Sequence, residues 1–285
     1  METAQARQSA ADALRAAVTA LANTPSAADA PALTAQALLA AVLGLSRAQL
    51  LAHPERMLSA AEQAAFAPAL ARAAAGEPLA YILGRREFYG LDLEVTPAVL
   101  VPRPETERLV ELAVARAPRR ALDVGTGSGC IAVALAVNAP GVSVMALDVS
   151  PAALAVAARN AQRHGVSDRI TFAQSDLLAA LPPVPAYDLL CANLPYIDTD
   201  ELRALPVAAH EPRLALDGGP GGLRLIERLL AQAPPCLAPG AALLLEIGAG
   251  QGPRALALAQ AAFPGANAAI VPDLAGLDRV LTITP

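Results

Sequence analysis

Apolar positions recur at helical spacing through the first part of the chain. Alanine and leucine dominate residues 1 to about 75, and two stretches place apolar residues three and four positions apart, as helices do: ALTAQALLAAVLGL and AAFAPALARAAA. Ser59 and Glu62 have the spacing of a capping box, in which each side chain bonds the backbone N–H of the other. Gly76, followed by Glu77-Pro78, is typical of a helix end. The pattern predicts a small helical domain.

The pattern changes between Gly76 and Glu107, which read GEPLAYILGRREFYGLDLEVTPAVLVPRPETE. Aromatic and β-branched residues become frequent there, and Gly84 and Gly90 interrupt them, as in a hairpin or an extended linker. We therefore expect three parts: a helical domain at residues 1–80, a β-hairpin linker at 81–108, and a larger domain at 109–285.

Beyond Leu109, short apolar runs that suit strands alternate with longer runs that suit helices. The strand-like runs are RALDV, VSVMALDV, RITFAQS, YDLLCAN and AALLLEIG, and two short strands, AAIVPDL and RVLTITP, follow. The helix-like runs between them are GCIAVALAVN, PAALAVAARNAQRHG, GLRLIERLLAQA and PRALALAQAAF. Near-continuous apolar strands alternating with helices predict an α/β fold whose parallel sheet is covered on both faces.

Composition excludes several classes of protein. The 285 residues allow one large domain and one small one. Hydrophobic residues make up 55%, but many are alanine. The sequence has no uninterrupted run of about 18 apolar residues, the length that a helix needs to span a membrane. The first residues, METAQARQSAADALRAA, lack the apolar stretch of a signal peptide. We therefore expect a cytoplasmic protein without a membrane anchor.

Cysteine, histidine and charge give little support to metal or nucleic-acid binding. The three cysteines lie far apart without a CxxC pair and the three histidines are scattered, so we expect neither a metal site nor a disulfide framework. The net charge is −5, and the basic clusters, such as Arg85-Arg86 and Arg119-Arg120, are small. Because nucleic-acid binding usually needs a basic patch, direct binding of RNA or DNA is not expected.

A glycine-rich loop follows the first strand of the larger domain. It reads Asp123-Val-Gly125-Thr-Gly127-Ser-Gly129 and runs into a helix. Glycines let the backbone turn sharply and approach a ligand, and the helix start offers free N–H groups. The spacing is GxGxG, preceded by an acid, rather than the GxGxxG of many dinucleotide sites. This spacing suits a ligand with an amino acid moiety better than a pyrophosphate, and a tight turn without a ligand is the alternative.

Two further acids end the next two strands. Asp148, at the end of the second strand, can accept hydrogen bonds from both ribose hydroxyls of a nucleoside. Asp176, after the third, can accept from an exocyclic amine such as that of adenine, with Leu177 packing on the ring. Each acid alone is as consistent with a helix cap or a solvated loop. Their order along successive strands favours one ligand at the carboxyl edge of the sheet.

The fourth strand ends at the same edge with Asn193-Leu194-Pro195-Tyr196. The Asn193 side-chain oxygen and the Leu194 backbone oxygen can accept two hydrogens from one planar NH₂ group. Pro195 stiffens the chain, and Tyr196 offers an aromatic face. The tetrapeptide therefore looks like a clamp for a planar amide or amine, although a strand-terminal asparagine beside a core tyrosine is the alternative.

These motifs resemble the class I S-adenosylmethionine-dependent methyltransferases. More narrowly, the chain resembles the HemK/PrmC family, the protein-(glutamine-N5) methyltransferases of peptide chain release factors. The resemblance covers nearly the whole chain, through GEPLAYILGRREFYG, LVPRPETE, LDVGTGSGCIA, LDVS, NLPYI, HEPRLALDGG, LLLEIG and DLAGLDRV. The first two motifs are the most specific to this family, whereas NLPY-type tetrapeptides are shared with enzymes that methylate adenine amino groups.

The resemblance implies a Rossmann-like, seven-stranded mixed sheet and methyl transfer to the glutamine of the release factors' Gly-Gly-Gln motif, modulating translation termination. The N-terminal helical domain would help recognise the class 1 release factor. Arg103 and Glu105 would shape the pocket rim. By matching position, the cofactor-binding residues would be Gly125, Thr126, Gly127, Ser128, Gly129, Asp148, Asp176, Leu177 and Asn193, and the catalytic, substrate-holding residues would be Asn193, Leu194, Pro195 and Tyr196.

The chain departs from the family pattern at two places, of which the first keeps another function open and the second concerns details of the N-terminal domain. Leu194 stands where the family usually has proline, and NLPY is also typical of ribosomal RNA adenine dimethylases. The segment near Thr34–Gln36 lacks an acid that many members carry. The alternatives are a glutamine methyltransferase of a ribosomal protein, an N6-adenine methyltransferase acting on RNA or DNA, and a non-catalytic adaptor that binds S-adenosylmethionine.

Overall fold

The computed structural model describes residues 8–23 and 30–285. The chain divides into two compact units, Met1–Gly84 and Arg85–Pro285. Each unit has its own hydrophobic core. The three-part division at residues 80 and 108, and the recognition role given to its first part, remain predictions.

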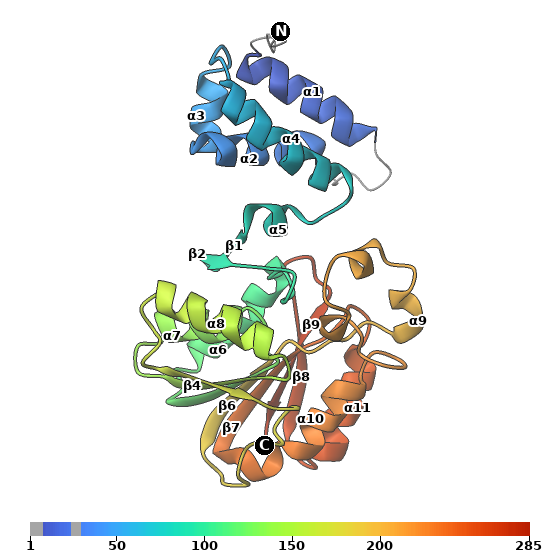
Figure 1. Ribbon diagram of the computed structural model, residues 1–285. Coiled ribbons are helices and arrows are strands. Elements are labelled where there is room, and N and C mark those ends of the chain that lie inside the picture. Colours follow the sequence, from blue (N-terminus) through green and yellow to red (C-terminus); the bar gives the residue numbers. More distant parts are fainter. Residues whose placement is uncertain (1–7, 24–29) are drawn as a thin grey trace. The chain divides into compact units, whose positions relative to one another are not determined.

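The N-terminal unit is helical, as the sequence pattern predicts (Figure 1). Its core is built from small and branched side chains, among them Ala17, Leu21, Leu38 and Leu39, all nearly inaccessible. Ser59 and Glu62 form the predicted capping box, with the Ser59 N–H donating to Glu62 at 2.8 Å. The helices are α1 (Ala10–Ala22), α2 (Pro31–Leu43), α3 (Arg47–Ala52), α4 (Ala60–Ala74) and α5 (Leu79–Leu83).

The second unit begins with the predicted hairpin. Strands β1 (Arg85–Phe88) and β2 (Leu91–Glu94) pair antiparallel through a two-residue turn. Both turn residues, Tyr89 (φ 51°) and Gly90 (φ 75°), have positive φ, as the tightest hairpin turns require. The hairpin buries Phe88 and Leu93 in the core of this unit, and this burial fixes its register.

A mixed seven-stranded sheet forms the centre of the second unit and confirms the predicted α/β fold. The strand order is β5-β4-β3-β6-β7-β9-β8; the first five of these strands run parallel, and β9 runs antiparallel to both β7 and β8. The strands are β3 (Arg120–Val124), β4 (Ser143–Asp148), β5 (Ile170–Gln174), β6 (Tyr187–Ala192), β7 (Leu237–Glu246), β8 (Asn267–Pro272) and β9 (Asp278–Thr284).

Helices cover both faces of this sheet (Figure 1). Side chains alternate along β3, so Leu122 and Val124 join one core while Ala121 joins the other. Helices α10 and α11 pack on the first core, and α6, α7 and α8 on the second. The helices are α6 (Glu107–Ala115), α7 (Cys130–Asn138), α8 (Pro151–Arg163), α9 (Thr199–Leu202), α10 (Arg224–Gln232) and α11 (Gly252–Ala262), with 3₁₀ turns η1 (Pro104–Thr106), η2 (Pro206–Ala209), η3 (Arg213–Ala215) and η4 (Pro234–Cys236).

No helix in the described part of the chain has the length and apolar character needed to cross a membrane. Within residues 8–23 and 30–285, no cluster of histidine, cysteine and acidic side chains has a geometry that could hold a metal ion.

Candidate active site

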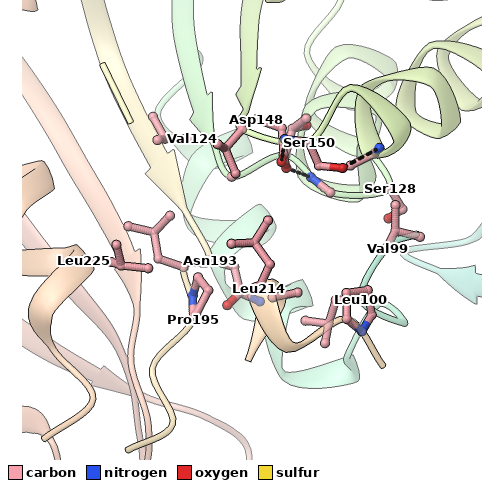
Figure 2. A pocket seen from close by; sticks show the side chains of 18 of the residues that line it. Val99, Leu100, Val124, Ser128, Asp148, Ser150, Asn193, Pro195, Leu214 and Leu225 are labelled. Atoms are coloured by element: carbon pink, nitrogen blue, oxygen red, sulfur yellow. Dashed lines mark hydrogen bonds between the residues drawn. The ribbon is translucent and has the colours of Figure 1, made fainter. Parts of the chain in front are cut away.

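A cavity of about 390 Å³ opens at the carboxyl edge of the sheet (Figure 2). It lies where β3 and β6 are neighbours although β4 and β5 come between them in sequence. Chain order reverses at such a point, and the loops that leave the two strands part to form a crevice. Of the predicted site residues, the cavity wall includes Gly125, Thr126, Gly127, Ser128, Asp148, Asp176, Leu177, Asn193, Leu194 and Pro195. Gly129 and Tyr196 are not part of that wall.

The three glycines of the loop have backbone conformations that other residues rarely adopt. Gly125, Gly127 and Gly129 have φ values of 75°, 55° and 80°. A Cβ atom on Gly125 would lie 2.9 Å from Leu194 Cδ2, and one on Gly129 would lie 3.0 Å from Ala157 Cβ. The first and third glycines therefore permit close packing inside the protein, whereas Gly127 faces the cavity.

Asp123 holds the loop in place through two hydrogen bonds. Its carboxylate accepts hydrogen bonds from Thr126 Oγ1 at 2.7 Å and from the Ala132 N–H at 3.1 Å. Burial raises the pKa of Asp123 to about 7, although both hydrogen bonds act to lower it. The acid thus ties strand β3 to the start of α7, and the loop between them is held in place.

Asp148, predicted to bind ribose hydroxyls, ends β4 and lines the cavity (Figure 2). One carboxylate oxygen accepts from the Gly127 N–H at 2.8 Å and the other from the Ser150 N–H at 2.9 Å. Burial raises the pKa of Asp148, and these backbone bonds oppose the rise. A carboxylate offers about four lone-pair positions, so the acid retains capacity for further hydrogen bonds.

Asp176 and Leu177 follow β5 on the cavity wall. Asp176 is ion-paired to Arg228 of α10 at 2.8 Å, and both side chains are exposed. Leu177 has a φ of 53°, which is unusual for a bulky residue and costs of order 1–2 kcal/mol. Such strain persists only where the surrounding structure enforces it. Here, the adjacent Leu178 N–H donates to Gln232 Oε1 at 3.0 Å.

Asn193 leaves β6 with a defined orientation. Its Nδ2 donates to Thr106 Oγ1 at 3.0 Å, so the amide nitrogen faces the protein. The amide oxygen is then available as an acceptor at the cavity wall, where Asn193 and Pro195 lie together (Figure 2). Leu194 is buried beneath Gly125. The Asn193 oxygen is thus one acceptor for a planar NH₂ group, and the clamp as a whole remains a prediction.

Tyr196, predicted to offer an aromatic face to the substrate, is held inside the protein by two hydrogen bonds. Its hydroxyl donates to Glu246 Oε1 at 3.4 Å, and its backbone oxygen accepts from Gln251 Nε2 at 2.9 Å. Burial, followed by the neighbouring Glu246 charge, raises the pKa of Tyr196 to about 12. The side chain braces the tetrapeptide from behind, and contact with a substrate remains a prediction.

Three residues at or near the site, Glu211, Thr106 and Glu246, have no role predicted from the sequence. Arg103, predicted to shape the rim, lines the cavity and is paired at 2.7 Å with Glu211, which is buried. Glu211 also accepts from the Val101 N–H at 3.1 Å. Each of these residues lies in one of the family motifs: Glu211 in HEPRLALDGG, Thr106 in LVPRPETE and Glu246 in LLLEIG. Their hydrogen-bond partners, however, are far away in sequence. The motifs therefore mark the residues without revealing what they bond.

Two protein-family profiles match the chain. The profile of the PrmC N-terminal domain matches residues 5–84, and that of a methyltransferase domain matches residues 121–211. Among solved structures, the catalytic domain of hMettl16 in complex with the MAT2A 3′UTR hairpin 6 is 20% identical, with a TM-score of 0.52. The match covers 72% of this chain and 79% of that one, and it supports a shared fold.

Curated relatives match over most of their length. A release factor glutamine methyltransferase of Moorella thermoacetica is 46% identical over 87% of this chain and 89% of its own. Enzymes with the same name from Koribacter versatilis and Cereibacter sphaeroides are 43% and 45% identical, over 91% and 96% of this chain and 92% and 97% of their own. The resemblance inferred from the motifs is thereby confirmed, and the chain belongs to the release factor glutamine methyltransferase family.

Proposed function

We propose that this protein transfers a methyl group from S-adenosylmethionine to the side-chain amide nitrogen of the glutamine in the Gly-Gly-Gln motif of peptide chain release factors. The observation that carries the proposal is Asn193, whose amide nitrogen is bound to Thr106 so that its oxygen can accept from an incoming NH₂ group. A glutamine side chain ends in such a group. The names of the relatives supply the release factor as the protein that bears it.

The residues on the cavity wall fit S-adenosylmethionine. A Cβ on Gly127 would meet nothing nearer than Gly125 O at 4.0 Å, so any side chain there would extend into the cavity that the glycine leaves open. We propose that the Gly125–Gly129 loop holds the amino acid moiety, with Gly129 acting through the loop's shape. Asp148 would hold the ribose hydroxyls, and Asp176 and Leu177 the adenine. Bound there, S-adenosylmethionine supplies an electrophilic methyl group on its sulfonium.

The protein's contribution to the reaction is mainly positioning. An amide nitrogen is a poor nucleophile because its lone pair is delocalised, and fixing it in line can supply about 7–11 kcal/mol of the barrier. Asn193 Oδ1 and the Leu194 carbonyl would accept the two N–H hydrogens and stabilise the positive charge that grows on nitrogen. Since an alkylated amide nitrogen loses its proton readily to water, the site needs no general base.

The cavity itself favours a protein substrate. Leu100, Pro102 and Leu214 line it with apolar surface, and Leu214 is 62% exposed. A net charge of −5 opposes binding to phosphate backbones. We further propose that the N-terminal helical unit contributes to recognising the release factor, and that the protein acts in the cytoplasm, where translation ends.

Methyl transfer from isotopically labelled S-adenosylmethionine tests this function. Purified class 1 release factor should be labelled, and a variant with the Gly-Gly-Gln glutamine replaced by alanine should not. Ribosomal RNA and ribosomal proteins serve as competing substrates in parallel reactions. Label on RNA alone would instead favour an adenine methyltransferase, and label on a ribosomal protein alone the sister specificity. Cofactor binding without transfer to any of these substrates would favour the non-catalytic adaptor.

A further inference from the structure

Two leucines of the turn between β8 and β9 are exposed to solvent. Leu274 is fully exposed and Leu277 is 50% exposed, and neither joins a hydrophobic core formed by the described residues. The turn, residues 273–277, follows the carboxyl edge of the sheet, because β9 is antiparallel to β7 and pairs Val280 with Glu246, the last residue of β7. The cavity opens at the same edge. The two leucines and the cavity therefore lie on one side of the catalytic unit.

Polar groups, and not the leucines, set the conformation of this turn. Asp273 Oδ1 accepts from the N–H groups of Ala275 and Leu277 at 2.9 and 3.0 Å. Asp273 Oδ2 accepts from Arg279 Nη2 at 3.1 Å, and both of these side chains are largely buried. The Gly276 N–H donates to Asp273 O at 3.0 Å. The leucine side chains are therefore presented on a backbone whose hydrogen bonds do not depend on them.

Short contacts connect the turn to the tetrapeptide that follows β6. Gln251 Nε2 donates to Tyr196 O at 2.9 Å, and the N–H of the next residue, Gly252, donates to Asp278 Oδ2 at 3.1 Å. Asp278 directly follows the turn. Only β7 separates β6 from β9 in the sheet, a lateral distance of about 10 Å. A protein whose glutamine side chain reached Asn193 would bring its neighbouring residues close to the turn.

We propose that Leu274 and Leu277 form a docking surface for the release factor, which covers them with an apolar patch of its own while its glutamine enters the cavity. The inference rests on the proposed function and deepens it by naming a surface that recognises the protein substrate. Leu214, on the cavity wall, is 62% exposed, so apolar side chains are available both at the cavity and at the turn.

The chemistry of the turn favours a folded protein as its partner. Burial of an exposed leucine at an interface removes apolar surface from water, a gain that the free protein does not obtain. Because the turn is already ordered by its own hydrogen bonds, little conformational entropy is lost on binding. The leucine side chains offer no donor to a phosphate backbone, and the nearby Arg279 is paired with Asp273.

Substitution of both leucines separates docking from chemistry. The double variant Leu274→Ser with Leu277→Ser should raise the KM for the release factor about tenfold, with kcat and the Kd for S-adenosylmethionine unchanged. Leu274→Met with Leu277→Met keeps the apolar surface and should leave KM within about threefold of the wild type. The Tm of each variant should equal that of the wild type, because these side chains lie outside the cores.

Val184→Ser is the matched control. Val184 is 52% exposed, and it precedes β6, so it lies toward the opposite edge of the sheet. Its loss should leave the KM for the release factor unchanged. An equal rise in KM for Val184→Ser and for the serine double variant would overturn the proposal, because the effect would then be general to exposed apolar residues.

A second measurement needs no turnover. A photoreactive phenylalanine analogue at position 274 should cross-link to purified release factor, and the same analogue at position 184 should not. Either an unchanged KM in the serine double variant or the absence of a cross-link from position 274 would overturn the docking surface, while methyl transfer by the wild type would still support the proposed function. If the wild type transfers no methyl group to the release factor, the proposed function fails, and the cross-link still decides whether the two proteins meet at the turn.

Discussion

Asn160 offers a direct test of how the hairpin and the glycine loop are held together. This α8 residue is fully buried, and its side-chain amide makes three hydrogen bonds to the backbone. Oδ1 accepts from the Glu94 N–H at 2.7 Å, while Nδ2 donates to Glu94 O at 2.9 Å and to Ser128 O at 2.9 Å. One side chain thus joins β2 to the loop that lines the cavity. We predict that Asn160→Ala is strongly destabilising.

The magnitude follows from the groups left behind. The substitution removes one acceptor and two donors from three backbone groups, two on half-buried Glu94 and one on buried Ser128, and a buried group left unpaired costs about 1–3 kcal/mol. Water entering the vacated space recovers part of this, so we take the lower end, about 3 kcal/mol in the free energy of unfolding. For a unit of this size that corresponds to a decrease in Tm of about 6–12 °C.

The assay is denaturant unfolding followed by far-ultraviolet circular dichroism, because the chain has no tryptophan for fluorescence. Asn138→Ala is the matched control: this exposed asparagine makes one bond, to Ala134 O at 2.8 Å, and its loss should cost less than about 0.5 kcal/mol. If Asn160→Ala lost less than about 1 kcal/mol, the reasoning from unpaired backbone groups would be refuted.

Three further predictions concern the cavity and its supports. Asn193→Ala should lower kcat about 100-fold or more while S-adenosylmethionine binding, measured by calorimetry, stays within about threefold; turnover near that of the wild type would contradict the clamp. Gly125→Ala should weaken cofactor binding, because its Cβ would lie 2.9 Å from Leu194 Cδ2 at a φ of 75°. Adding Leu194→Ala should relieve the clash but not the φ strain, so a double variant no better than Gly125→Ala would count against steric contact as the cause. Because burial raises the pKa of Glu246 from 4.5 to about 7, its contribution to stability is complete below the unfolded pKa and is lost as pH rises through the folded one. The Tm of Glu246→Gln minus that of the wild type should therefore increase between about pH 5 and about pH 8, by the equivalent of up to about 3 kcal/mol. A constant difference across this range would show that Glu246 does not titrate as inferred.

The sequence predicts the parts of this protein that depend on local pattern. Alternating apolar runs locate the strands of the sheet, and the spacing of Ser59 and Glu62 identifies a capping box that the structure contains. Asp148 ends β4 and Asn193 directly follows β6, so their meeting at one edge follows from the fold class alone. These inferences work because helical and strand periodicity are properties of short segments. They also work because all parallel strands of one sheet end at the same edge.

Partnerships between distant side chains are not predictable in this way. Thr106 and Asn193 are bonded across 87 positions, and Asp176 and Arg228 are paired across 52. Each pair depends on how a loop folds over the sheet, which no local periodicity records. Tyr196 shows the same limit, since its position in the motif does not reveal that its hydroxyl is bonded to a buried acid.

The order of the last three strands has a consequence for synthesis on the ribosome. Strand β9 is made after β8 but pairs between β7 and β8. Until β9 has left the ribosomal exit tunnel, β7 and β8 both expose unpaired edges, which are open to pairing with other chains. The nascent protein can thus assemble the cavity residues from β3 to β6 while its sheet is still incomplete. Chaperone dependence during translation should be greatest in the interval between the completion of β7 and the arrival of β9.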